Sequence, residues 1–315
     1  MPIKITGTGS YIPKKIVKND EFLNRDFYDK DGKPYSDSNI EIIEKFQSIT
    51  GIKERRYAEE NHNTSDLATF ASENAIESAK IDKEDLDYII VAHNFGEIDF
   101  GSGQYIALPS VATLVKHKLA IENPNCVAYD LIFGCPGWVE GVIQSSAYIK
   151  SGLAKRCLVI GADTLSRTVD KSDRDSMIFA DGAGASIIEE SSEAGGILSH
   201  KTVTYSGKEE LYLFCDRTFN PNSNSIEKHI KMNGRKVYEF AISTIPGALK
   251  KCLDESGKNI QDVKKIFIHQ ANEKLDEAVL KYFYKQYDKE IPKNIMPISV
   301  DVYGNSSVAT IPTLY

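Results

Sequence analysis

The sequence predicts an α/β fold in which strands and helices alternate along the chain. Two observations support this prediction: short apolar runs of strand length recur throughout, and amphipathic stretches of helix length lie between them. At 315 residues, the chain is long enough for two domains or for one large α/β unit. It contains no internal repeat, no low-complexity tract and no obvious linker.

Strands and helices alternate clearly through the first half. Residues 64–80 show the helix pattern best, because a Thr-Ser-Asp cap precedes apolar side chains that recur on one helical face. Further helices are predicted over residues 108–120 and 136–152. Predicted strands cover residues 3–13, 86–94, 125–133 and 156–163. Residues 175–190 predict a strand, a tight glycine turn at "FADGAGA" and another strand.

The second half continues in the same style. It predicts a helix over residues 232–256, a strand over 263–270, a helix over 271–288 and the start of another helix within 303–315. The polar residues 25–39 are expected to form an exposed loop.

Composition and charge exclude several classes of protein. The formal net charge of −7 argues against general binding to nucleic acid or to anionic membranes, both of which favour a basic face. No run approaches the roughly 18 consecutive apolar residues of a membrane span, and the first residues are too polar for a signal peptide. The five cysteines show no C-x-x-C spacing, so we expect free thiols, no bound metal and a reducing cytoplasm.

Cys135 stands where a buried strand is expected to give way to a buried helix. The strand is expected to end near Phe133, Gly134 permits a tight turn, and Pro136 suits the first helical position. A thiol at the start of a helix lies at the positive end of the helix dipole, which favours the nucleophilic thiolate. The alternative is a small buried hydrophobic side chain, as most free cysteines are.

Two polar residues in the second half could complete a site around this thiol. His269 follows the predicted strand 263–270 at its end, where side chains reach the carboxyl edge of a sheet. Asn305 lies in the glycine turn "VYGNSS", before the last predicted helix. Taken singly, a structural histidine and an ordinary turn asparagine are the simpler interpretations.

Taken together, these motifs resemble a known family. The stretches "AYDLIFGCPGW", "GADTLSR", "FADGAGA", "HIKMNGRKVYEFA", "IHQAN" and "DVYGNSS" occur in the order and at the separations expected of β-ketoacyl-acyl-carrier-protein synthase III, a branch of the thiolase superfamily. The resemblance runs from "GTGSYIP" to the last residue. Each fragment is weak by itself, whereas the joint match is specific.

The resemblance implies a decarboxylative Claisen condensation by a Cys-His-Asn site. Cys135 would take an acyl group from a thioester donor, and malonyl-acyl-carrier protein would then lose CO2 to form an enolate that attacks the acyl-enzyme. His269 and Asn305 would donate hydrogen bonds to the thioester oxygen as negative charge develops, and the Cys135 amide would serve the acyl oxyanion. The reaction calls for no metal and no organic cofactor.

The resemblance also implies a fold and a set of binding residues. The fold would be the five-layered αβαβα thiolase arrangement of two similar α/β halves, here residues 1–185 and 186–315, in a homodimer. Leu108 would enter the acyl pocket of the partner subunit, and the alternative is a leucine of the dimer core. Arg235 and Lys274 would suit the phosphopantetheine channel and the acidic carrier protein, although solvated cations are the simpler interpretation of each.

The sequence departs from the family where acetyl-CoA-primed members stack the CoA adenine between a Trp and an Arg. Those positions hold Lys45 and Ile49, while a second arginine of that site survives as Arg174. Tight CoA priming is therefore in doubt, and an acyl-carrier-protein thioester or another acyl donor is an alternative. An insertion at "FYDKDGKPY" also resembles specialised members that make secondary metabolites, including alkylresorcinol-type products.

Other interpretations stay open at this point. The scaffold could carry a Cys-His acyltransferase or hydrolase with a non-malonyl second substrate, or a non-catalytic partner subunit of a heterodimer. "GTGSYI" resembles a dinucleotide loop but lacks its third glycine and later acidic residue. Relatives are expected to continue past "SVATIPTLY" into two further strands, so the sequence predicts an incomplete second sheet.

Overall fold

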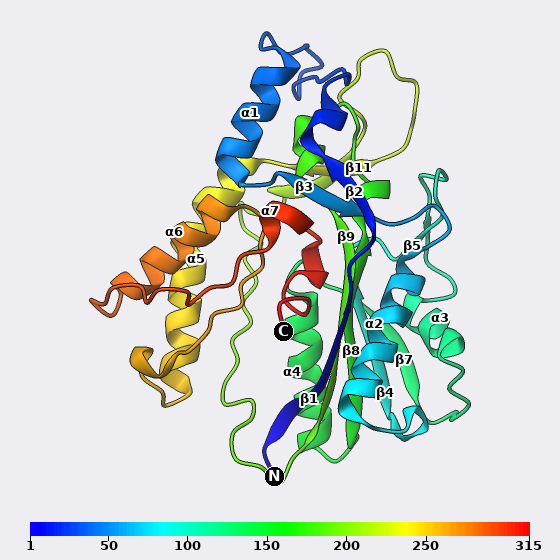
Figure 1. Cartoon of the computed structure of the whole chain (residues 1–315), viewed down its shortest axis with the longest axis vertical. Coiled ribbons are helices and arrows are strands. Elements are labelled where there is room, and N and C mark those ends of the chain that lie inside the picture. Colours follow the sequence, from blue (N-terminus) through cyan, green and yellow to red (C-terminus); the bar gives the residue numbers. More distant parts are fainter.

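The computed structural model describes residues 1–315 and is built around one mixed five-stranded sheet (Figure 1). The strand order is β1-β9-β8-β4-β7, with β4, β7 and β8 parallel and β9 antiparallel to both β8 and β1. The strands are β1 (Ile3–Tyr11), β4 (Tyr88–His93), β7 (Val127–Ile132), β8 (Arg156–Thr164) and β9 (Asp181–Glu190). The expected α/β architecture is therefore present in this sheet.

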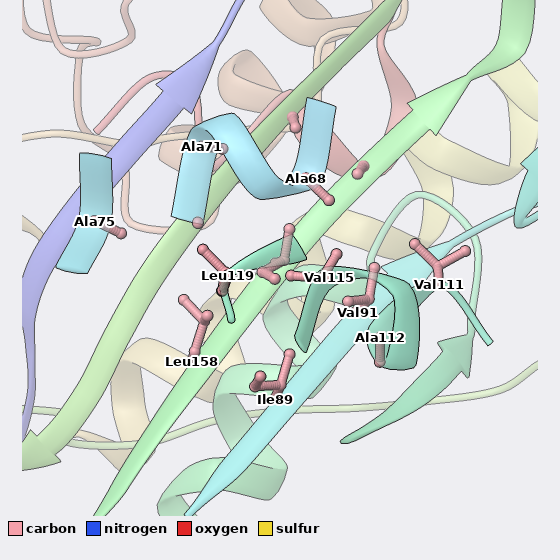
Figure 2. Packing of buried hydrophobic residues seen from close by; sticks show 14 of the residues in the cluster. Ala68, Ala71, Ala75, Ile89, Val91, Val111, Ala112, Val115, Leu119 and Leu158 are labelled. Carbon is pink, nitrogen blue, oxygen red and sulfur yellow. The ribbon is translucent and has the colours of Figure 1, made fainter. Parts of the chain in front are cut away.

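Helices cover both faces of the sheet because strand side chains alternate between the two faces. Leu158 and Ile160 of β8 join the apolar cluster under α2 (Thr64–Ala79) and α3 (Val111–Lys118), part of which Figure 2 shows. Val159, between them, joins the opposite cluster under α4 (Gly137–Lys150). The central strands β4 and β8 are thus almost entirely buried, as expected of strands covered on both faces.

The remaining helices form a separate group beside this sheet. Figure 1 shows α1 (Asn39–Thr50), α5 (Gly234–Glu255) and α6 (Glu273–Lys285) together on one side, where α6 contacts both of the others. Ser38 and Glu41 form a capping box at the start of α1, and Gly51 ends it with a φ of +78°. This capped helix was not among the predicted elements.

Shorter elements complete the chain. Two-stranded pairs form between β2 (Lys15–Lys18) and β3 (Glu54–Tyr57), β5 (Glu97–Ile98) and β6 (Tyr105–Ile106), and β10 (Leu213–Asp216) and β11 (His229–Met232). Near the C-terminus lie α7 (Val300–Tyr303) and a 3₁₀ turn over Ser307–Ala309. No helix is both long and apolar enough to span a bilayer.

Two predicted elements differ from the structure. The "FADGAGA" stretch is not a turn between strands, because residues 181–184 are the start of the continuous strand β9, preceded by a 3₁₀ helix over Arg174–Ile178. Gly184 serves close packing, because a Cβ there would lie 2.6 Å from the Pro312 side chain. Residues 263–270 form no strand, because they have no ladder partner: their backbone N–H groups make only two backbone hydrogen bonds, from Val263 to Ile260 and from Ile266 to Ile295.

The C-terminal segment is held against the sheet near the end of β8. The Asn305 N–H donates to the Ile178 carbonyl over 3.0 Å, and the Asn305 carbonyl accepts from Ala180 N–H over 2.8 Å. Val308 packs in the apolar cluster with Trp138 of α4. This placement brings residues 305–308 to the carboxyl ends of the parallel strands.

Candidate active site

Cys135 lies in the short connection between β7 and α4, as the sequence predicts. Gly134 has a φ of +69°, the left-handed conformation that makes the turn tight, and α4 begins two residues after the cysteine, at Gly137. The backbone N–H of Cys135 donates no hydrogen bond within the protein. A free amide beside a helix start is available to a negatively charged oxygen.

The thiol of Cys135 and the imidazole of His269 shift each other's pKa. Burial raises the pKa of Cys135. The positive charge of His269 and hydrogen bonds from His269 and Ser307 lower it by more, so the net pKa lies below its usual value. Burial likewise lowers the pKa of His269, while the charge of Cys135 and the bond to it raise the pKa above its usual value. Both shifts favour a thiolate–imidazolium pair.

The neighbouring Gln270 holds His269 in place without help from a sheet. Its side chain is fully buried, and its carbonyl oxygen accepts hydrogen bonds from Ser299 N–H at 2.8 Å and Val300 N–H at 3.0 Å. Its amide group donates to the Pro297 carbonyl at 2.5 Å. These three bonds fasten the extended segment 263–270 to the chain entering α7.

Asn305 belongs to the same cluster through Ser307. The Asn305 side-chain oxygen accepts the Ser307 N–H over 2.8 Å, and the Ser307 hydroxyl donates to the Cys135 sulfur over 3.3 Å. Because the oxygen is occupied, the carboxamide NH2 of Asn305 is the group left to donate to another molecule. Gly304, with a φ of +71°, makes the turn that the sequence predicts.

The four expected binding residues are dispersed over the surface around this cluster. Leu108 is 85% exposed in the connection before α3. Arg174 stacks on the Tyr35 ring, with 4.5 Å from the guanidinium carbon to the ring centroid. Arg235 pairs with Glu239 at 2.9 Å on the surface of α5, and Lys274 is exposed in the first turn of α6. No hydrogen bond joins any of them to Cys135.

The geometry can be compared with known proteins. A relative from Clostridium acetobutylicum, described as β-ketoacyl-[acyl-carrier-protein] synthase III, is 37% identical over 314 residues, which are 98% of this chain and 87% of the relative. The chain belongs to the β-ketoacyl-acyl-carrier-protein synthase III family. It is accordingly an acyl-transferring condensing enzyme, and the predicted family is confirmed.

Further comparisons agree with membership of this synthase III family. The sequence model of the family described as 3-oxoacyl-[acyl-carrier-protein] synthase III matches residues 129–206, which include Cys135. The synthase III structure from Thermus thermophilus is 30% identical, with a TM-score of 0.80 over 98% of this chain and 88% of that one. The priming β-ketosynthase of the R1128 polyketide pathway, 21% identical, shares the fold with the same TM-score over 99% of this chain and 85% of that one. The thiolase-like fold class is thus confirmed.

One buried carboxyl of this synthase III chain was missed from the sequence. Asp276 on α6 is 2% exposed, its Oδ2 atom has no hydrogen-bond partner, and burial raises its pKa to about 8 although the charge of His269 opposes the shift. The signal was available in the helix pattern. Asp276 occupies the first position of an apolar stripe that continues through Val279, Leu280, Phe283 and Tyr284.

Proposed function

We propose that this synthase III family member condenses an acyl thioester with malonyl-acyl-carrier protein through an acyl-Cys135 intermediate. The observation that supports this most strongly is the Cys135 thiol, whose pKa is lowered beside His269 and Ser307. A lowered pKa makes the thiol easier to ionise, and the thiolate is the nucleophile that covalent acyl transfer needs. The 3-oxoacyl-acyl-carrier protein product would serve fatty-acid initiation or a specialised polyketide or alkylresorcinol-type synthesis.

In the first half-reaction, the Cys135 thiolate attacks the carbonyl carbon of the donor thioester. The free N–H of Cys135 stabilises the oxyanion, the C–S bond to the donor breaks, and the imidazolium of His269 protonates the departing thiolate. The negative charge of Cys135 is one of the causes that raise the pKa of His269. Acylation removes the negative charge of Cys135, which lowers the pKa of His269. His269 therefore becomes neutral as it gives its proton to the departing thiolate.

In the second half-reaction, malonyl-acyl-carrier protein loses CO2 as its carbon–carbon bond breaks. The electron pair moves onto the thioester oxygen, which accepts hydrogen bonds from neutral His269 and from the NH2 group of Asn305. The enolate carbon then attacks the acyl-Cys135 carbonyl, and the Cys135 thiolate leaves. His269 recovers its proton from solvent, which returns the pair to its starting state.

The donor is proposed to be an acyl-carrier-protein thioester or another non-acetyl-CoA donor. Lys45 and Ile49 are both exposed on α1, four residues apart on one face, and neither offers an aromatic ring. Arg174 already stacks on Tyr35 of the insertion, so one face of its guanidinium is covered by protein. A nucleotide base therefore meets neither an indole nor a fully free arginine.

The acidic carrier protein is the proposed macromolecular partner, and the cytoplasm the proposed location. Lys274 is exposed without an ion-pair partner, in keeping with contact to an acidic protein. Arg235 is less available, since it is paired with Glu239, a carboxylate that it shares with Lys236. Lys274 is therefore the stronger of the two predicted carrier contacts.

A homodimer is proposed on the basis of the open edge of the sheet. Strand β7 pairs only with β4, and Val127 and Ile132 expose apolar side chains at its two ends. A twofold axis at this edge would let two copies pair β7 with β7, and would leave the exposed Leu108 near the partner. Light scattering would show a mass of two chains if this is correct and of one chain if it is wrong.

The condensation itself is tested with acyl-carrier-protein thioesters and malonyl-acyl-carrier protein. The expected products are CO2 and 3-oxoacyl-acyl-carrier protein in equal amounts, detected by gas trapping and by protein mass. A Cys-His acyltransferase would instead move the acyl group without CO2 release, and a non-catalytic subunit would yield neither product. Either result would overturn the proposal.

A further inference from the structure

A chain of short hydrogen bonds reaches the Cys135 sulfur from the sheet. The buried Asp163, near the end of β8, accepts from Asn94 twice: from its backbone N–H over 2.9 Å and from its Nδ2 over 2.6 Å. The same Nδ2 donates to the Ser307 hydroxyl over 2.8 Å, and that hydroxyl donates to the sulfur over 3.3 Å. The bonds join the ends of β4 and β8 to the C-terminal segment.

The donor and acceptor inventory of these side chains fixes the direction of each bond. Burial raises the pKa of Asp163 to about 7, so above that pH the carboxylate only accepts, and the amide nitrogen of Asn94 faces it. That nitrogen has two hydrogens, and the second one points at the Ser307 oxygen. Because this oxygen accepts from Asn94, its single hydroxyl proton is free to point at the sulfur.

We propose that Ser307 is a further catalytic residue that stabilises the Cys135 thiolate, and that Asn94 is a positioning residue, clamped by Asp163, that aims the Ser307 hydroxyl. The inference rests on the proposed function in taking Cys135 as the nucleophile. The same hydrogen bond stabilises the thiolate twice, before it attacks the donor and again when it leaves the acyl group.

Several charged groups lie around this chain of hydrogen bonds, and they also influence the ionisation of Cys135. His269, on the segment before α6, and Asp163, on β8, act on Cys135 with opposite signs. Asp276 of α6 acts on His269. His93, the last residue of β4 and the neighbour of Asn94 in the chain, pairs with Asp130 of β7 at 3.0 Å. All of them stay in place when the Ser307 hydroxyl is removed, so a change in thiol ionisation reports on that hydroxyl.

The experiment measures the rate at which iodoacetamide alkylates Cys135 between pH 5 and 10, with peptide mass spectrometry separating it from the exposed Cys215. Ser307→Ala is expected to raise the midpoint of the profile by about one pH unit, since a hydrogen bond to a charged group is lost. Ser307→Gly should do the same with less strain, because Ser307 has a φ of +53°. Ser306→Ala removes the neighbouring hydroxyl, which has no bond to the sulfur, and should leave the midpoint unchanged.

A double-mutant cycle tests whether Asn94 acts by orienting the Ser307 hydroxyl or only by supporting the fold. Asn94→Ala should raise the midpoint in the wild-type background and cause no further shift in Ser307→Ala, because it acts through that hydroxyl. Unchanged midpoints in both Ser307 variants, an equal shift in Ser306→Ala, or additive shifts in the cycle would overturn the inference. Alkylation needs no acyl substrate, so the result is independent of whether the proposed condensation is correct.

Discussion

At the scale of single residues, the ionisation of Cys135 depends on a balance of opposed effects. Burial favours the neutral thiol, and Asp163 adds to that preference, whereas His269 and the Ser307 hydroxyl favour the thiolate. The net pKa falls, so the two polar neighbours outweigh the environment. The nucleophile therefore depends on residues more than 130 positions away in the chain.

Cys135→Ser is expected to abolish acyl loading. A serine hydroxyl has a far higher pKa than a thiol, and His269 alone does not supply the matching arrangement of a serine hydrolase. Intact-protein mass after incubation with acyl thioesters measures the loss. Loading of the Ser variant at a rate comparable to wild type would show that Cys135 is not the nucleophile.

His269→Ala and Asn305→Ala should impair malonyl decarboxylation far more than acylation of Cys135. Each removes one donor to the developing enolate oxygen, an effect of roughly 10²–10³-fold in related chemistry. Single-turnover acylation and CO2 release are measured separately for each variant. Equal losses in both half-reactions of His269→Ala would indicate that the histidine acts mainly as the base for the thiol.

Asp276→Asn should stabilise the fold increasingly as the pH rises. The folded pKa of about 8 lies above that of an unfolded aspartate, so the folded state holds the proton more tightly and its stability falls as pH rises from about 4 through 8. The asparagine variant avoids this loss. Its melting temperature should exceed that of wild type by roughly 4 °C or more at pH 8 and by little at pH 4.

The exposed Glu44 of α1 provides a control for this prediction, because it is a helix carboxylate on another element and is not among the charges that act on Asp276. Glu44→Gln should leave the pH dependence of melting unchanged. Parallel melting curves for wild type and Asp276→Asn across this pH range would contradict the assignment of a raised pKa to Asp276.

Sequence reasoning reached Cys135, His269 and Asn305 because each stands in a recognisable local motif. Sequence reasoning missed three other residues, Gln270, Ser307 and Asp276, because their importance comes from contacts made across the fold. Ser307 in particular is an ordinary turn residue until Asn94 and Cys135 are brought against it. Asp276 alone left a local signal, a carboxylate in an apolar helical stripe.

At the scale of elements, helix α1 bears most directly on the choice of acyl donor. Lys45→Trp together with Ile49→Arg should lower the KM for acetyl-CoA by roughly tenfold, since stacking on a cation or an indole is worth about 1–2 kcal/mol. Lys45→Ala with Ile49→Ala is the control and should leave the KM unchanged. A wild-type enzyme already saturated by micromolar acetyl-CoA would contradict the prediction.

The elements that could be predicted are those with strong periodicity on both sides of a clear turn. Helix α2 and strands β4, β7 and β8 begin and end within two residues of their expected bounds. The glycine-rich start of β9 predicts a turn, because glycine in a strand has the same local signal as glycine in a turn. The ladder with β8 and the packing of Pro312 against Gly184 distinguish the two. The segment 263–270 has a strand pattern, but a strand also needs a ladder partner.

At the scale of the whole molecule, sheet topology gathers the site. The parallel strands β4, β7 and β8 are neighbours, so their carboxyl ends meet at one edge, where Asn94, Cys135 and Asp163 follow or end them. This convergence was predictable once the strand order was known. The sequence could not supply the order itself, and the division of the chain at residues 185 and 186 remains a prediction.

The central claim is that an acyl group passes through Cys135 on its way to malonyl-acyl-carrier protein. The most direct measurement incubates the protein with a pool of acyl-CoA and acyl-carrier-protein thioesters, digests it and weighs the peptide that contains Cys135, before and after a chase with malonyl-acyl-carrier protein. We predict an added acyl mass on Cys135 that disappears in the chase as 3-oxoacyl-acyl-carrier protein of matching chain length appears. An acyl group on another residue, or one on Cys135 that the chase does not remove, would contradict the claim.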